Sequence, residues 1–148
     1  MISLRLSRPD DAARTLAVWA AAVDATHPFL TPADRVAIGD EVAAFLPHVP
    51  LLLAVDENDC AIAFMLVADG MLEALFVDPA HHGTGIGKAL VSRALADNPG
   101  MSIDVNAQNG GAVQFYRRLG FVETGRSDRD GQGRAYPLVH MRHAGCNS

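Results

Sequence analysis

The 148-residue sequence predicts a single α/β domain, with a mixed central sheet of about seven strands flanked by about four helices. Stretches with the two-residue period of strands alternate with stretches that have the longer period of helices. Three successive strand-like stretches, 51–56, 61–68 and 71–79, form a meander. The glycine-rich segment 81–90 then joins the last of them to a helix. The predicted element order is β-α-α-β-β-β-α-β-α-β-β.

The first three elements are marked by their boundaries. Segment 2–7 alternates apolar and polar residues, as a half-buried strand does. Pro9 and the two acidic residues after it begin a helix, because proline and negative charge are both favoured at a helix start. HPFLTP at 27–32 ends this helix, and a second one runs from Thr31 toward Pro47.

The later elements are separated by turn residues. Asp69-Gly70 is a strong tight-turn signal inside the meander. After the glycine-rich segment a helix extends to about Asp97. The remaining sequence predicts a strand over MSIDVN (101–106) and a helix over NGGAVQFYRRLG (109–120) that is closed by Gly120. FVETGRS and RAYPLVHMR then form a hairpin around the turn DRDGQG.

Composition restricts the class of protein. The formal net charge is −5, which argues against broad nucleic-acid binding, since that requires a basic surface. No run of about 18 apolar residues predicts a membrane span, and the first residues lack the features of a signal peptide. Cys60 and Cys146 are the only cysteines, too few for a disulfide framework. We therefore expect a cytoplasmic protein.

The segment HHGTGIGKAL (81–90) is the most informative stretch, because a strand, a glycine loop and a helix often bind phosphate. A P-loop is excluded, since His82 stands at its first glycine and Ala89 replaces its hydroxyl residue. The dinucleotide fingerprint also fails, because the glycine spacing is wrong. A plain tight turn is the structural alternative.

The segment from His82 to Gly87 resembles the Arg/Gln-x-x-Gly-x-Gly/Ala motif of the GNAT N-acetyltransferase family, with His82 in place of Arg or Gln. A second element of that family, Asn-x-x-Ala-x-x-x-Tyr followed by Gly-Phe, is matched by Asn109, Ala112, Tyr116 and Gly120-Phe121. DATHPFL, EALFVDP, DVNAQN and GRSDRDGQGRAYPLVHM extend the resemblance, to a YjaB-like subgroup, over nearly the whole chain. The resemblance implies a GNAT domain over 1–143 and a short tail at 144–148.

The resemblance implies acetyl-CoA as co-substrate. Glycines let backbone N–H groups approach an anion, and the helix start adds about half a positive charge, so the loop suits the CoA pyrophosphate. Asn109 is expected to cap its helix, with contact to the cofactor as the alternative. The predicted cofactor-binding residues are Leu75, Phe76, Val77, His82, Gly83, Thr84, Gly85, Ile86, Gly87, Lys88 and Asn109.

Acyl transfer to an amine needs a base for the amine and a proton donor for the departing thiolate. Tyr116 matches the tyrosine that faces the CoA sulfur in many family members, and a phenol is protonated at neutral pH. An amphipathic core tyrosine is the alternative. Glu73 is the candidate base, since apolar strand neighbours would raise the pKa of its carboxyl group. An exposed strand position is the alternative for Glu73.

The acceptor is less clearly marked. The resemblance places His27, Phe29 and Tyr136 in an acceptor pocket for a small-molecule or peptide amine, although His27-Pro28 is equally a helix breaker. No metal site is expected, because no Cys/His pair has zinc spacing and DRDGQG lacks the later acid of a calcium loop. A homodimer is one option. The prediction is an acetyl-CoA-dependent N-acetyltransferase; a tRNA-modifying variant conflicts with the acidic balance, and a non-catalytic acyl-CoA-binding module is the alternative.

Overall fold

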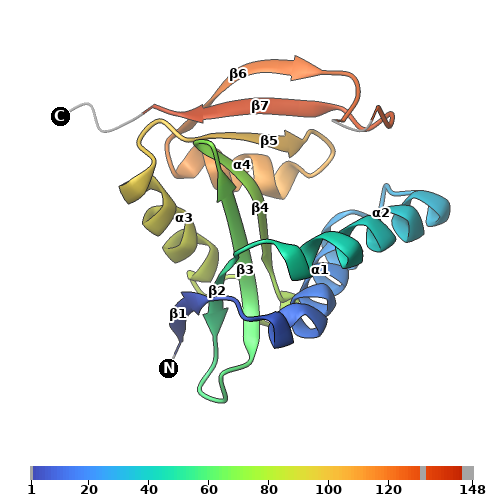
Figure 1. Cartoon of the computed structure of the whole chain (residues 1–148). Coiled ribbons are helices and arrows are strands. Elements are labelled where there is room, and N and C mark those ends of the chain that lie inside the picture. Colours follow the sequence, from blue (N-terminus) through green and yellow to red (C-terminus); the bar gives the residue numbers. More distant parts are fainter. Residues whose placement is uncertain (1, 131–132, 145–148) are drawn as a thin grey trace. The chain divides into compact units, whose positions relative to one another are not determined.

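The computed structural model describes residues 2–130 and 133–144. Residues 145–148 of the predicted tail, Cys146 among them, and part of the DRDGQG turn therefore lie outside the described residues. Within the described residues the chain forms seven strands and four α-helices, as predicted (Figure 1). The strands are β1 (Ser3–Leu6), β2 (Leu52–Val55), β3 (Ala61–Ala68), β4 (Met71–Val77), β5 (Ser102–Asn106), β6 (Phe121–Ser127) and β7 (Leu138–His143). The helices are α1 (Ala12–Thr26), α2 (Pro32–Phe45), α3 (Ile86–Asp97) and α4 (Gly110–Arg118).

The strands form one mixed sheet in the order β1-β2-β3-β4-β5-β7-β6. β4 and β5 run parallel, whereas the pairs β1–β2, β2–β3, β5–β7 and β6–β7 are antiparallel. The chain divides into two compact units, the first made of Met1–Leu66 and Ala74–Leu90 and the second of Val67–Glu73 and Val91–Ser148. Among the described residues, none of the helices combines the length and the apolar composition that a membrane span needs.

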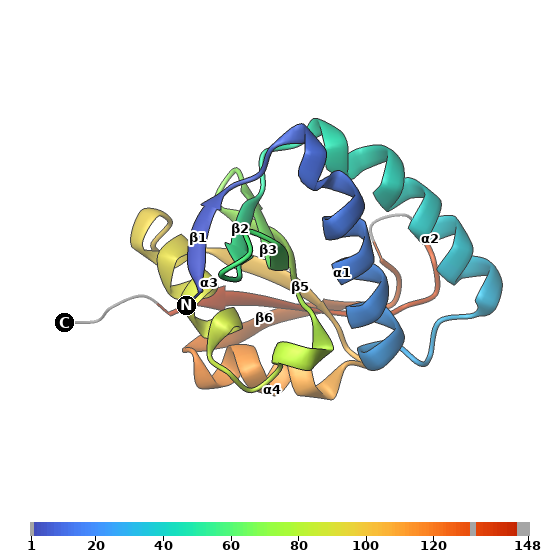
Figure 2. The same ribbon diagram turned by 90° about the horizontal axis from the view of Figure 1, so that it is seen from below.

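The first unit is built around the apolar faces of α1, β2 and β3. Val18, Trp19, Leu53 and Phe64 are almost fully buried there. α2 lies beside α1, as Figure 2 shows. The two helices are joined where Arg35 of α2 stacks 4.7 Å from the centroid of the Trp19 ring and its Nε lies 2.8 Å from an Asp24 carboxylate oxygen.

The second unit packs α4 against one face of β5, β7 and β6. Strand alternation turns Ile103, Val105, Val139 and Met141 toward that face, where all four are buried. The opposite face of β5 carries the polar residues Ser102, Asp104 and Asn106. At the start of the unit, Asp69 and Gly70 both have positive φ, at 54° and 75°, which is the two-residue hairpin turn that the sequence predicts.

Two predicted boundaries were wrong. The first helix does not begin at Pro9, because Pro9–Asp11 forms a 3-10 turn in which the Asp11 carboxylate accepts a hydrogen bond from the backbone N–H of Arg8 at 2.7 Å. The last strand begins at Leu138 rather than at Arg134. Pro137 precedes it, and proline cannot donate a ladder hydrogen bond.

Candidate active site

The glycine loop leaves β4 through a short, well-anchored turn. Asp78 begins the 3-10 turn Pro79–His81 by accepting a hydrogen bond from the N–H of Ala80 at 3.0 Å. The other Asp78 oxygen accepts from Arg14 of α1 at 3.2 Å. The loop then passes through Gly83 and Gly85, with φ of 78° and 84°, a region that side chains with a Cβ rarely adopt. An added Cβ at either glycine would meet no protein atom within 4 Å, so both glycines face open space.

The loop and the first turn of α3 present a row of free donors. Ala89 is the first residue of the helix whose N–H bonds back into the loop, to the Gly85 carbonyl at 3.0 Å. Within the part of the chain that the structure describes, the backbone N–H groups of Gly83–Lys88 have no hydrogen-bond acceptor. Free N–H groups at a helix start favour the binding of an anion. A pyrophosphate needs donors of this kind, so the loop residues fit that group.

His82 is tied to the backbone beneath the loop. Its Nε2 lies 3.0 Å from the Val77 carbonyl, and the Thr84 hydroxyl donates to the His81 carbonyl at 2.6 Å. A carbonyl only accepts, so Nε2 of His82 carries the proton and the ring braces the loop against β4. On β4 itself, Leu75 and Val77 are half-buried, and the Phe76 ring packs 5.5 Å from that of Phe64.

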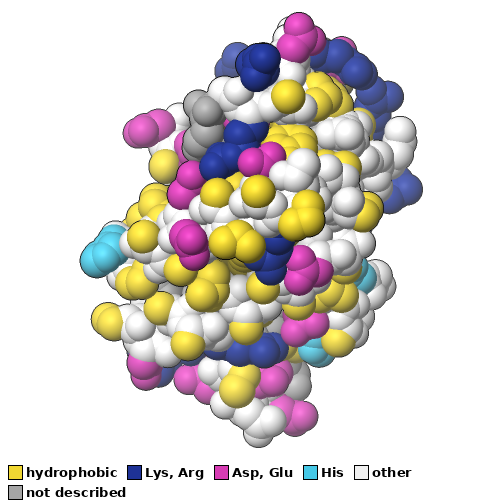
Figure 3. Space-filling view, turned by 90° about the vertical axis from the view of Figure 1, so that its right-hand side faces the viewer, with side chains coloured by type: hydrophobic (Ala, Val, Ile, Leu, Met, Phe, Trp, Pro, Cys, Tyr) yellow, Lys and Arg dark blue, Asp and Glu magenta, His cyan; other side chains and the backbone are white. Residues whose placement is uncertain are grey.

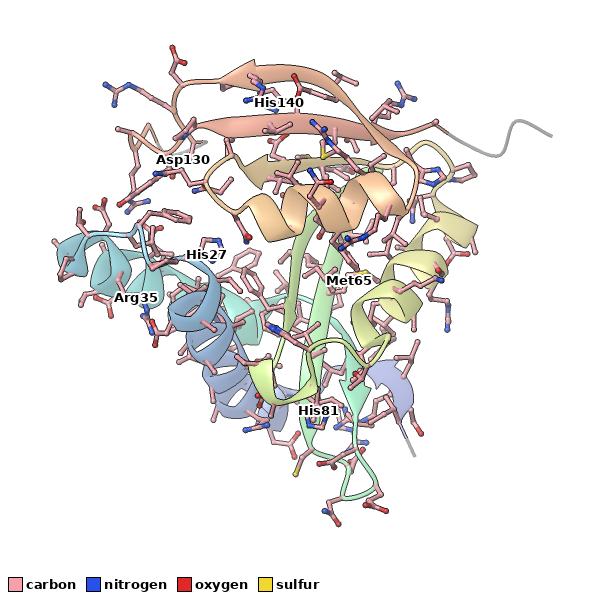
Figure 4. All side chains as sticks on the ribbon, turned by 180° about the vertical axis from the view of Figure 1, so that it is seen from behind. His27, Arg35, Met65, His81, Asp130 and His140 are labelled. Atoms are coloured by element: carbon pink, nitrogen blue, oxygen red, sulfur yellow. The ribbon has the colours of Figure 1, made fainter. Side chains whose placement is uncertain are left out.

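His27 and Phe29 follow the end of α1 in the first unit (His27 is labelled in Figure 4). Their ring centroids lie 5.2 Å apart. Burial lowers the pKa of His27, so the imidazole is neutral at neutral pH. The Thr26 hydroxyl donates to the Ala22 carbonyl at 2.7 Å, and Nδ1 of His27 lies 2.7 Å from the Thr26 hydroxyl oxygen. Nδ1 is therefore the donor, which leaves Nε2 with a free lone pair.

Tyr116 occupies the buried face of α4 in the second unit. Only 8% of the residue is exposed, and Phe115 and Phe121 approach its ring edge-on at 5.0 Å and 5.4 Å between centroids. Burial raises the pKa of the phenol, so Tyr116 stays protonated and can donate. Asn109 caps the same helix, since its side-chain oxygen accepts from the N–H of Ala112 at 3.2 Å. The capping role predicted for Asn109 is thus confirmed.

Glu73 is exposed on β4, directly after Leu72, which pairs with Ile103 of β5. The sequence-based expectation of an apolar surrounding for its carboxylate was wrong. Leu72 is buried on the opposite side of the strand, so the alternation that buries Leu72 turns Glu73 toward solvent. Tyr136, also of the second unit, is 8% exposed, and its N–H donates to the Arg134 carbonyl at 2.8 Å.

Comparison with known proteins identifies the family. The profile of the acetyltransferase (GNAT) domain matches residues 41–143. The chain belongs to the GNAT acetyltransferase family. It is 43% identical to the peptidyl-lysine N-acetyltransferase YjaB of Escherichia coli K12 over 99% of both chains. It is 45% identical to the protein of the same name from Salmonella typhimurium, over 95% of this chain and 97% of the relative.

Solved structures agree with this GNAT assignment. The solution structure of apo-form YjaB from Escherichia coli superposes with a TM-score of 0.93 at 42% identity, covering 99% of each chain. The PaiA N-acetyltransferase of Thermoplasma acidophilum, solved in complex with coenzyme A, shares the fold with a TM-score of 0.67 at 17% identity, over 97% of this chain and 99% of that one. The chain is thus an acyltransferase of the GNAT family, and members of this family use acetyl-CoA.

Several residues that shape this GNAT site escaped the sequence analysis. Asp78 and Arg14 anchor the glycine loop after β4, and the Asp-Pro pair after an apolar strand is the local signal that could have shown Asp78 as a cap. Thr26 fixes the tautomer of His27 and carries no local signal. A cavity of about 230 Å³ in the first unit, lined by Arg8, Thr15 and His48 among others, contains none of the predicted site residues.

Proposed function

We propose that this protein transfers the acetyl group of acetyl-CoA directly to the side-chain amine of a lysine in a peptide or protein. The observation that carries the proposal is the row of six free N–H groups in the glycine loop and the first turn of α3, which suits a polyanionic co-substrate. The lysine acceptor is supported by the names of the YjaB relatives, which are 43% and 45% identical and cover nearly the whole chain.

The loop is proposed to bind the cofactor mainly through its backbone. Gly83, Thr84, Gly85, Ile86, Gly87 and Lys88 donate to the pyrophosphate oxygens. Leu75, Phe76 and Val77 of β4 face the pantetheine arm with their backbone groups. His82, already bonded to Val77, holds the loop in shape and presents its second ring nitrogen outward. This role differs from that of an arginine, which would bring a permanent charge to the phosphates.

Tyr116 is proposed as the proton donor to the departing thiolate. Its burial favours the protonated phenol at every physiological pH, which is the state that a general acid needs. The resemblance of its helix to the second GNAT element supports this role, since Asn109 and Tyr116 stand at the family spacing. As the C–S bond breaks, the phenol proton passes to sulfur, and solvent returns a proton to the phenolate.

Two residues are proposed to take the proton from the acceptor amine, and a different observation supports each of them. The exposed carboxylate of Glu73 attracts a cationic acceptor and can take a proton through water. His27 is neutral, and its free Nε2 lone pair can accept a proton directly. With Phe29 and Tyr136, His27 also belongs to the proposed acceptor pocket, where an aromatic ring next to an imidazole suits an alkyl ammonium chain.

The acidic balance of the chain favours a cationic acceptor. Its formal net charge is −5, and Figure 3 shows acidic and basic side chains interspersed with apolar ones over the face in view.

We propose no nucleic-acid partner and no metal. We also propose a GNAT domain over 1–143, a tail at 144–148, a homodimer as one option for the assembly, and a cytoplasmic location that the free, exposed Cys60 favours.

The decisive experiment measures release of free CoA from acetyl-CoA with three acceptors at equal concentration. They are a lysine-containing peptide with a blocked N-terminus, the same peptide with arginine for lysine, and spermidine. Acetylation of the lysine peptide, located by mass spectrometry, supports the proposal. Acetyl-CoA binding in calorimetry without any CoA release above hydrolysis would instead identify a binding module. Transfer only to spermidine would overturn the lysine assignment and keep the transferase.

A further inference from the structure

A hydroxyl, an imidazole and a carboxylate form a continuous hydrogen-bonded chain in the second unit. The Ser127 hydroxyl oxygen lies 2.5 Å from Nε2 of His140. Nδ1 of the same ring lies 2.6 Å from a carboxylate oxygen of Asp104. The three residues come from three different strands, β6, β7 and β5, and none of them belongs to the proposed transferase machinery.

The chemistry of the partners fixes the protons in this chain. A carboxylate only accepts, so Nδ1 of His140 donates to Asp104. In the neutral ring Nε2 then carries the lone pair, and the Ser127 hydroxyl donates to it. A serine whose proton points at an imidazole nitrogen, with a carboxylate holding the other nitrogen, has the arrangement that activates nucleophilic serines.

The strand register brings the three side chains to one face. Asp104 and His140 are direct cross-strand partners of β5 and β7. His140 is also opposite Gly125 on β6, and Ser127 lies two residues further along β6 on the same side. The register of β6 shifts between Glu123 and Gly125, and this irregularity sets the side on which Ser127 points.

The face that carries these groups is accessible. The buried residues of β5 and β7, such as Ile103 and Met141, turn toward α4, so Asp104 and His140 lie on the other side of the sheet, where Figure 4 labels His140 on β7. The exposed fractions of the His140 and Asp104 side chains are 32% and 37%. Gly125 leaves room at the ring, because even an added Cβ there would stay 3.7 Å from Cδ2 of His140.

We propose that Ser127 is an activated nucleophile that accepts an acyl group from small activated acyl esters, with His140 as its base and Asp104 as the residue that positions His140. The Ser127 oxygen attacks the acyl carbon while its proton passes to Nε2 of His140. The bond from the acyl carbon to the leaving oxygen breaks, and His140 returns the proton to that oxygen. The products are Ser127 acyl ester and the free alcohol or phenol.

This reactivity is separate from acetyl transfer to an amine. It needs Ser127, His140 and Asp104 only, whereas the proposed cofactor contacts lie in the loop after β4. A variant of Ser127 is therefore expected to keep acetyl-CoA binding. The face presents the nucleophile on a strand surface, so we expect a single stoichiometric acylation by a small ester rather than selection of a large substrate.

The test treats the full-length protein with 4-nitrophenyl acetate and, separately, with a fluorophosphonate probe. Intact-mass and peptide mass spectrometry then locate and count the adducts. We expect one adduct on Ser127 and none in Ser127→Ala. Ser102→Ala is the matched control, because Ser102 is a serine on the same face of strand β5, which pairs with β7, and its adduct yield should equal that of the unchanged protein.

Two further variants test the relay. His140→Gln and Asp104→Asn should slow acylation of Ser127 by about 10²-fold or more, the contribution typical of a positioned base. Asp104→Glu should restore part of the rate, which a merely structural role of Asp104 would not predict. Thermal unfolding identifies any variant that fails to fold. In that case, formation of the Ser127 adduct in the unchanged protein alone tests the proposal. Absence of a Ser127 adduct in the folded, unchanged protein, or rates unaltered by both relay variants, would overturn the proposal.

Discussion

Replacing Gly85 by alanine tests whether the loop after β4 binds the pyrophosphate through its backbone. Gly85 has a φ of 84°, and an added Cβ would meet no protein atom within 4 Å. The substitution therefore causes no clash in the free protein. It costs the strain of a left-handed alanine, roughly 1–2 kcal/mol. The new methyl group instead occupies the open side of the loop, where the anion is proposed to bind.

The magnitude follows from the donors that the methyl group would displace. A hydrogen bond between a backbone N–H and a charged phosphate oxygen is worth about 1.5–3 kcal/mol. Losing one such contact should raise the Kd for acetyl-CoA by roughly 10- to 100-fold, since about 1.4 kcal/mol corresponds to a factor of ten. Isothermal titration calorimetry at fixed ionic strength measures this change directly.

Gly70 supplies a matched control for backbone strain. Its φ is 75°, an added Cβ there also meets open space, and it lies in the turn between β3 and β4. Gly70→Ala and Gly85→Ala should lower the melting temperature by similar amounts, but only Gly85→Ala should weaken acetyl-CoA binding. Equal Kd values for the unchanged protein and both variants would refute the loop assignment, because strain alone would then explain everything that Gly85→Ala does.

Of three further predictions, two concern the proposed chemistry and one concerns stability. Tyr116→Phe should lower kcat by about 10²-fold with little change in the Kd of acetyl-CoA, measured with a substrate whose chemistry limits turnover, since it removes only the phenol proton; an unchanged kcat would exclude Tyr116 as the acid. Glu73→Gln and His27→Gln should separate the two proposed bases. The variant that has lost the base should have a reduced kcat/KM at neutral pH that recovers partly at alkaline pH. Loss of a group that only attracts the cation should raise KM without such recovery. The third concerns stability. Burial holds the pKa of His27 below its ordinary 6.5, so in acid the unfolded chain binds more protons than the folded one. The free energy of unfolding should therefore be constant above about pH 7 and decrease toward pH 5. His27→Gln should remove that part of the decrease in urea titrations, and an unchanged pH slope would contradict the burial of the ring.

The sequence contained the features of the site that are local. A positive φ requires glycine, so the loop at Gly83 and Gly85 could be predicted from residue type and spacing alone. The cap at Asn109 and the turn at Asp69-Gly70 follow the same logic, because the interacting groups lie within a few residues of one another. These are the elements for which prediction and structure agree.

Features that depend on strand register or on burial could not be predicted from the sequence. Alternation placed Glu73 on a face with Leu75 and Val77 but could not say that this position of β4 is exposed. The contacts of Asp104, His140 and Ser127 require the pairing of three strands and a register shift in β6, none of which is encoded within one segment. The start of the last strand was missed for a local reason, because the proline at 137 was not taken as its boundary.

The choice between Glu73 and His27 depends on when the acceptor loses its proton. A lysine amine has a pKa near 10.4, so only about one molecule in 10³ is free at pH 7.4. Neither a carboxylate nor an imidazole of lowered pKa can hold that proton before attack. Either one becomes a sufficient base only as the N–C bond forms and the nitrogen grows more acidic. At that moment the neutral Nε2 of His27, fixed by the bond from Nδ1 to Thr26, needs no rearrangement to accept the proton. We propose that the exposed carboxylate of Glu73 contributes earlier, by attracting the cationic amine. The two residues therefore suit successive steps, and alkaline recovery in His27→Gln together with a raised KM in Glu73→Gln is the combination that this division requires.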